Sequence, residues 1–294
     1  MKISQQKRKY LILITLFICS GIASFSQDLP SEKKGRVLYT GFVNVVPDKF
    51  KFPLIGFINV AQGSQKNLHL GFVNTTGNNF SGAQISFLNI AGGNTKGVQV
   101  GFVNKTKTLR GLQLGFFNYA ESVEKGVPIG FFSFVKNGGY RAVKVSMNEM
   151  YPMNLSFDVG VKKFYTTIVG SYNGDLKKKY AVGLGIGSII DIYRNVYFNP
   201  EAIIQSTDVN NISNNRILSL RPQVGFKLFS NIDVLWGPSL VWQNAEGQAV
   251  LNKPFYSLFK TAPDNKNNLI GGANISLKLH LSKRMPNKRY FSAW

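Results

Sequence analysis

The sequence predicts an exported all-β protein: a narrow N-terminal β-solenoid of about seven fifteen-residue repeats, followed by an antiparallel β-barrel of approximately eight strands. Three observations predict this architecture. A Gly-Phe-x-Asn motif recurs in tandem through the first half, and longer segments of alternating apolar and polar residues fill the second half. The N-terminus has the order of a secretory signal peptide.

Residues 1–26 carry that signal. Basic residues come first, an apolar run follows from Tyr10 to Ala23, and small residues lead to Ser26. The run is shorter than the roughly 20 residues that a membrane-spanning helix needs. We expect cleavage after Ser26 and a linker over residues 27–37. Cys19 is the single cysteine and lies inside the signal, and the bulky Ile18 before it disfavours lipid attachment.

The repeat occupies residues 38–138. Its seven units follow one another in steps of 15 residues, with one step of 14. The recurring aromatic positions are Phe42, Phe57, Phe72, Phe87, Phe102, Phe116 and Phe131. The recurring amide positions are Asn44, Asn59, Asn74, Asn89, Asn104 and Asn118. We predict structural roles for both sets.

The one-unit period favours a solenoid over an up-and-down meander. In a meander, neighbouring strands run in opposite directions, so identical residues would fall in alternating environments, whereas stacked coils give every unit the same environment. Fifteen extended residues cover roughly 50 Å, enough for two short strands and two turns.

Alternation along the strand predicts which residues share a face. In the unit from Gly97, the residues Val98, Val100 and Phe102 share one face, which we expect to be the core. The phenylalanines would then form an inner column and the asparagines a hydrogen-bonded column at a turn. Gln84, Gln99 and Gln113 form a shorter row, predicted to be structural, or a ligand-binding row if that face is exposed.

Residues 139–282 show the alternation expected of antiparallel strands, and residues 283–294 form a basic tail. We predict eight strands, near residues 140–147, 152–162, 164–170, 180–190, 194–205, 217–228, 232–243 and 269–282.

The connections favour an outer-membrane barrel, because short turns alternate with long polar loops. Aromatic residues near the strand ends suggest an interfacial girdle. They are Tyr140, Tyr151, Phe164, Tyr165, Tyr172, Tyr193, Tyr197, Phe229 and Trp242.

Pro200, Pro222 and Pro238 inside presumed strands count against a barrel, which keeps a soluble sandwich or open sheet as the alternative. An eight-stranded lumen is filled by side chains, so we expect no pore.

The later repeat units read Gly-x-Gln-x-Gly-Phe-x-Asn and close on Pro128-Ile129-Gly130-Phe131, then Gly138-Gly139-Tyr140. In this they resemble a family of bacterial surface-repeat proteins from Gram-negative genomes. The resemblance implies a location at the cell surface or outer membrane, and it offers no catalytic residues.

Catalytic and metal-binding patterns are not found. The carboxylates of the repeats do not recur at a fixed position, as calcium-binding solenoids require, and His69 and His280 lie in different halves. We therefore predict no metal and no cofactor. Asp158, Glu201 and Asp233 could in principle serve a hydrolase. In a barrel lumen they would instead pair with cations, and the candidates are Lys144, Lys162, Arg221, Lys227 and Lys278.

The predicted function is that of a non-enzymatic outer-membrane or cell-surface protein with a structural, adhesive or envelope-binding role. The formal net charge of +21 suggests anionic surroundings, so the expected partners are outer-membrane lipid and an anionic envelope polymer or glycan, not nucleic acid. The runner-up is a soluble secreted or periplasmic repeat protein that binds glycan or envelope polymer. A hydrolase comes third.

Overall fold

The computed structural model describes residues 39–175, 179–207, 215–245, 253–264 and 266–282. The predicted signal peptide, linker and basic tail lie outside these residues. The described elements are all strands, which confirms the all-β prediction. Within the same ranges, no helix is long and apolar enough to cross a membrane. The chain divides into two compact units, Met1–Thr106 and Lys107–Trp294.

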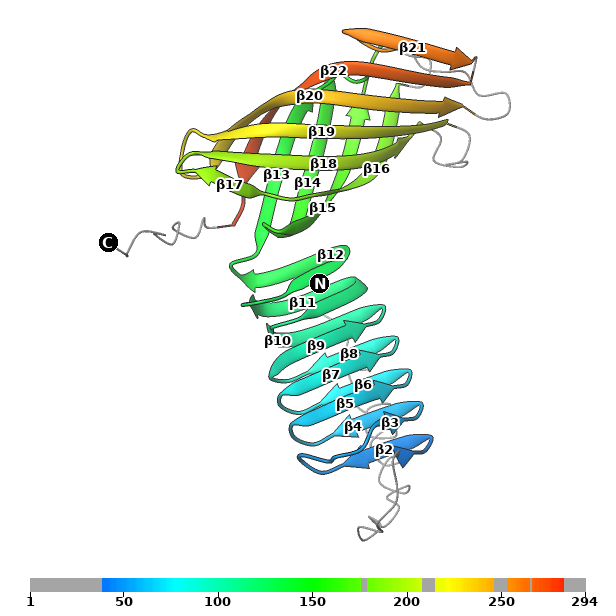
Figure 1. The fold of residues 1–294 in the computed structure, drawn as a ribbon, viewed down its shortest axis with the longest axis vertical. Helices are drawn as coiled ribbons and strands as arrows, with labels where there is room; N and C mark the ends of the chain where they lie inside the picture. Colours follow the sequence, from blue (N-terminus) through cyan, green and yellow to red (C-terminus); the bar gives the residue numbers. More distant parts are fainter. Residues whose placement is uncertain (1–38, 176–178, 208–214, 246–252, 265, 283–294) are drawn as a thin grey trace, which may run out of the picture. The chain divides into compact units, whose positions relative to one another are not determined.

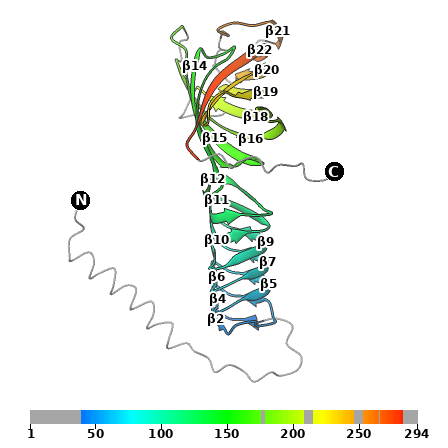
Figure 2. The same ribbon diagram turned by 90° about the vertical axis from the view of Figure 1, so that its left-hand side faces the viewer.

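The first unit is built from flattened coils of two short strands each (Figure 1). One row of strands is β1(Tyr39–Thr40), β3(Leu54–Ile55), β5(Gln65–Leu70), β7(Phe80–Ile85) and β9(Asn94–Val100). The other row is β2(Val43–Val46), β4(Ile58–Ala61), β6(Val73–Thr76), β8(Leu88–Ala91) and β10(Val103–Leu109). Figure 2 shows the two rows separately.

Within each row, strands pair in parallel with their counterparts in the next coil. Asn59 lies beside Asn74 and Gln84 beside Gln99, a shift of one whole repeat. Such pairing is the property that distinguishes a solenoid from a meander, so the predicted β-solenoid of about seven turns is confirmed. In the second unit, β11(Leu112–Val123) and β12(Val127–Asn137) form one further parallel pair.

The second unit also contains the barrel. Its eight strands are β13(Tyr140–Met147), β14(Met153–Val161), β15(Phe164–Tyr172), β16(Tyr180–Gly187), β18(Val196–Ser206), β19(Asn215–Lys227), β20(Ile232–Ala245) and β22(Asn267–His280). Each pairs antiparallel with the next, and β13 pairs with β22 to close the ring. The sandwich and open-sheet alternatives are therefore wrong. Two short strands, β17(Ile190–Tyr193) and β21(Phe259–Asp264), pair with β18 and β22 respectively.

The three strand prolines lie where the ladders are interrupted. Pro200 falls between the residues of β18 that pair with β17 and those that pair with β16. Pro222 and Pro238 lie where the ladder between β19 and β20 is interrupted, between Leu220↔Leu240 and Val224↔Trp236, and each is in register with the strand on its other side. Because those positions lack a regular ladder bond, the missing N–H of proline costs little there.

Candidate functional site

The interior of the solenoid is mainly polar, with a few buried apolar side chains such as Leu54 and Phe80. In the first unit Asn44, Asn59, Asn74, Asn89 and Asn104 are buried at the second residue of each even-numbered strand. Each Nδ2 donates to the Oδ1 of the asparagine in the next coil, over 2.7, 2.8, 3.1 and 2.9 Å for the four successive steps. The predicted hydrogen-bonded Asn column is confirmed, although it lies inside the strands and not at a turn. In the second unit, Asn118 donates to Ser133 Oγ at 3.2 Å.

Glycine precedes each repeat phenylalanine because the ladder leaves no space for a side chain. A Cβ at Gly71 would lie 2.7 Å from Asn59 Nδ2 and would also strike the carbonyl oxygen of Gly56. The exception is Ser86, whose hydroxyl donates to Asn89 Oδ1 at 2.7 Å and so joins the ladder.

The glutamine row is also interior, so the alternative of an exposed ligand-binding row is wrong and the structural alternative holds. Gln84, Gln99 and Gln113 have no exposed surface. Gln99 Nε2 donates to Gln84 Oε1 at 2.7 Å, and Gln84 Nε2 donates to Thr76 Oγ1 at 3.1 Å. These side chains point inward because their neighbours along each strand, such as Ile85, point outward.

His69 occupies the glutamine position one repeat before Gln84. It is fully buried, and its ring lies 5.0 Å from that of Phe80. Burial lowers the pKa of His69 to about 4. Neither ring nitrogen has a hydrogen-bond partner among the described residues. The glutamine column therefore ends at Gln84, since the equivalent residue on the other side of His69 is Leu54.

The phenylalanine column faces outward, and its predicted place in the core is wrong. The exposed fractions of Phe42, Phe57, Phe72, Phe87 and Phe102 are 73, 46, 45, 48 and 42%. Alternation correctly placed Val98, Val100 and Phe102 on one face, but that face is the outer one. Each Gly-Phe pair forms the corner between two strands, and amides that bond from coil to coil occupy much of the narrow interior.

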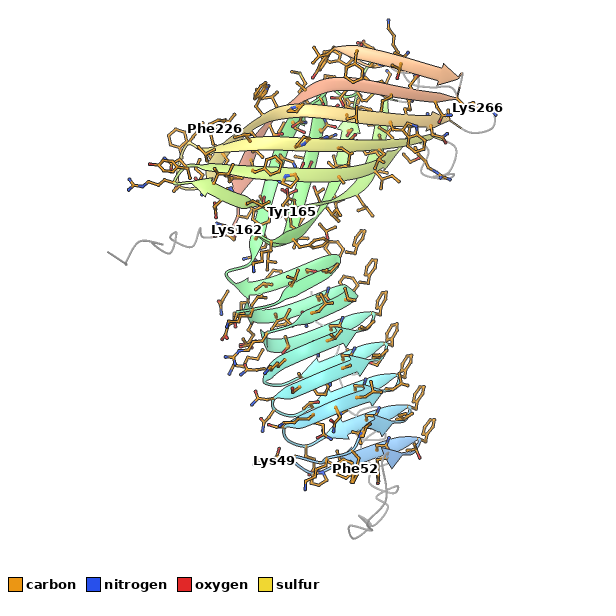
Figure 3. The ribbon with its side chains drawn as sticks, in the orientation of Figure 1. Lys49, Phe52, Lys162, Tyr165, Phe226 and Lys266 are labelled. Carbon is orange, nitrogen blue, oxygen red and sulfur yellow. The ribbon has the colours of Figure 1, made fainter. Side chains whose placement is uncertain are left out.

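Neighbouring rings of this column stack face to face. In the first unit the centroids are 5.0–5.1 Å apart and the ring planes differ by 2–5°. In the second unit, Phe116 and Phe131 stack in the same way at 4.7 Å. The ring faces therefore cover one another, and ring edges form the surface. Figure 3 shows the rings as a column along one edge of the coils.

Aliphatic residues flank the rings on both sides. The outward positions before each corner are Ile55, Leu70, Ile85 and Val100, and those after it are Val43, Ile58, Val73, Leu88 and Val103. All are partly or largely exposed. We call these positions, together with the five phenylalanines of the first unit, the apolar edge. It is a continuous uncharged strip.

Charged residues of the first unit lie away from the corners that carry the rings. Its described lysines are Lys49, Lys51, Lys66, Lys96 and Lys105, all exposed, and its one described acid is Asp48. Figure 3 shows Lys49 at the edge of the coils opposite the ring column. One edge of the solenoid is thus apolar and the remainder is basic.

The barrel lumen is filled by buried charges and tyrosines. Lys144 forms an ion pair with Glu201, and both side chains are fully buried. Tyr165 donates to Glu201 Oε1 at 2.7 Å, and Gln223 donates to Glu201 Oε2 at 3.1 Å. This network ties together four barrel strands.

A second buried ion pair joins Lys278 to Asp158 at 3.7 Å. Tyr140 donates to Asp158 at 3.1 Å, and Lys278 donates to Asn199 Oδ1 at 2.6 Å. The predicted structural pairing of Asp158 and Glu201 is thereby confirmed.

The other charged residues predicted for the lumen have different partners or positions. Lys162 and Lys227 both pair with Asp191, outside the lumen, because they lie next to β17 at the end of the barrel strands. Asp233 accepts from Tyr197 at 2.8 Å and lies 2.6 Å from His280 Nε2. In the part of the chain that the structure describes, no three His, Cys, Asp or Glu side chains are grouped to hold a metal ion.

The barrel exterior is apolar. Its outward side chains include Val145, Leu155, Ile186, Ile204, Leu220, Trp236 and Leu277, which are 45–58% exposed. Tyr193 and Phe229, near strand ends, are 68 and 66% exposed, as the predicted girdle requires. Four predicted girdle residues instead point inward and are buried, namely Tyr140, Tyr151, Tyr165 and Tyr197. Three of these hydroxyls serve the lumen carboxylates.

Comparisons with known proteins find little. No protein-family model matches the chain. No curated protein matches it either. Among solved structures, the crystal structure of Neisserial surface protein A (NspA) aligns with a TM-score of 0.28 and 10% sequence identity, over 49% of this chain and 97% of that chain.

Proposed function

We propose that this chain is a non-enzymatic outer-membrane protein, in which the barrel is the membrane anchor and the solenoid performs a structural, adhesive or envelope-binding role. One observation carries the proposal: a closed eight-stranded barrel with charged residues inside and apolar residues outside. In water this distribution is unfavourable, whereas in a bilayer it places hydrocarbon against lipid and keeps the charged side chains away from it.

The lumen argues for an anchor and against a channel. Lys144, Lys278, Asp158 and Glu201 are packed to full burial at its centre. We expect no reproducible single-channel conductance from the purified protein in planar bilayers, since small barrels of this kind are filled by their own side chains.

Membrane fractionation with a heat-modifiability gel tests the anchor. We expect the protein to resist an alkaline wash of the membranes and to migrate differently before and after boiling. Recovery in the wash with no heat shift would instead favour the soluble, glycan-binding alternative.

A substitution pair tests the exterior directly. Leu220→Arg places a charge on the outer face at the middle of β19, and should lower the free energy of unfolding by roughly 2–4 kcal/mol. Tyr193→Arg, at the end of β17, is the matched control and should cost at most about 1 kcal/mol near the interface. Equal tolerance of the two changes would argue against lipid around the barrel.

A further inference from the structure

We propose that the apolar edge of the solenoid is a second lipid-binding surface, which inserts its ring edges and aliphatic flanks into a bilayer that carries anionic headgroups. This inference deepens the proposed function and rests on it. The barrel would supply the transmembrane anchor, and the solenoid a separate interfacial contact.

The solenoid has the same inverted distribution as the barrel. Its amides are buried and its rings and aliphatic side chains face outward, with the rings 42–73% exposed against 45–58% for the seven outward barrel side chains named above. The inner ladder fixes this orientation, because the strand positions that face outward cannot turn inward without breaking the Asn and Gln columns. A continuous exposed apolar strip of this kind marks a site of interaction.

The geometry of the rings selects the ligand. Sugars stack on the faces of aromatic rings, but here each face is covered by the next ring at 5.0–5.1 Å. What remains is a ridge of C–H edges flanked by aliphatic groups, which suits alkyl chains. Glycan binding on this edge is therefore disfavoured.

Charge favours an anionic bilayer over a second copy of the chain. The described part of the first unit has five exposed lysines and one acid, all outside the apolar edge. Two copies would carry the same excess of positive charge, which disfavours their association. An element with an apolar face and a net positive charge is instead attracted to anionic headgroups.

Site-specific quenching tests the proposal in the full-length protein. Single cysteines replace Phe87, Lys96 or Leu220, in a Cys19→Ser background, and each carries an environment-sensitive fluorophore. The proteins are reconstituted in vesicles of phosphatidylcholine and phosphatidylglycerol that contain doxyl-labelled lipid, after the heat shift has confirmed a folded barrel. We expect strong quenching at Phe87→Cys and Leu220→Cys, and several-fold weaker quenching at Lys96→Cys.

The three labelled positions distinguish the possible results. Quenching at Leu220→Cys without quenching at Phe87→Cys would overturn the lipid-binding edge and leave the anchor intact, whereas no quenching at either would overturn the proposed function as well. A disulfide between two Phe87→Cys chains in unlabelled protein, with no lipid quenching, would identify a second copy as the occupant.

In vesicles of phosphatidylcholine alone, quenching at Phe87→Cys should fall several-fold, and an unchanged signal would overturn the role assigned to the lysines.

Discussion

The barrel and the solenoid both bury polar groups, but they satisfy them in different ways. In the barrel, each buried lysine has a carboxylate partner on another strand, as Lys144 has Glu201, whereas the guanidinium of buried Arg221 has no hydrogen-bond partner among the described residues. In the solenoid, identical neutral amides stack, and each coil supplies the partner of the next. Translational repetition makes self-pairing of amides possible, while a lumen without repetition requires complementary pairs.

The largest effect should follow from removing one member of a lumen ion pair. Glu201→Gln leaves Lys144 charged and fully buried, so we expect the free energy of unfolding to fall by roughly 3–5 kcal/mol. Urea unfolding in detergent, followed by Trp236 and Trp242 fluorescence, measures the loss in the barrel.

The double variant Lys144→Met with Glu201→Gln is the control for that change. It removes both charges, so much of the lost stability should return. A double variant no more stable than Glu201→Gln alone would show that the pair is not the source of the loss.

In the solenoid the corresponding change is smaller, because no charge is stranded. Asn74→Ala removes a rung that bonds Asn59, Asn89 and the carbonyl oxygen of Ile85. We expect a loss of roughly 2–3 kcal/mol from unsatisfied buried amides. Hydrogen-exchange mass spectrometry of peptides within residues 39–106 measures it. The exposed turn residue Asn78 gives the control, since Asn78→Ala should change exchange very little.

The smallest change should be a gain at His69. His69→Gln would extend the glutamine column and add about 1 kcal/mol near neutral pH. The folded-state pKa of about 4 lies below the unfolded value, so the unfolded state binds more protons as the pH falls from about 6.5 to about 4.

Between about pH 6.5 and about pH 4, the free energy of unfolding of the unmodified solenoid should consequently fall by up to roughly 3 kcal/mol. Above about pH 6.5, His69 should not change how that free energy depends on pH. Urea unfolding of the unmodified protein and of His69→Gln, followed by hydrogen exchange at about pH 7 and about pH 5, measures the gain and the pH dependence. An equal pH slope in His69→Gln would assign the titration to another group.

The sequence was sufficient for the architecture, because periodicity determines it. A fifteen-residue repeat requires Asn59 to lie beside Asn74, and strict alternation predicted the barrel strands within a few residues. The lumen pairs of Asp158 and Glu201 also followed, since buried charges need partners.

The direction of the faces did not follow from the sequence. Alternation groups Val100 with Phe102 but does not say which group is inside, and the usual rule that large apolar residues form the core gave the wrong answer for the solenoid. The signal that could have decided it was the recurrence of Asn and Gln at the same place in successive units, which we had assigned to a turn and to a row of undecided exposure. Recurring amides can satisfy one another only when buried in a stack, and this favours an amide interior over a phenylalanine one.

The first rung of the Asn column has a consequence for how such chains change in length. Asn44 Oδ1 accepts no hydrogen bond among the described residues, so the column has a free acceptor at that rung. The amide of an asparagine at the same place in a further coil could donate to this oxygen. The ladder is therefore compatible with added fifteen-residue units, and we expect close homologues to differ in coil number.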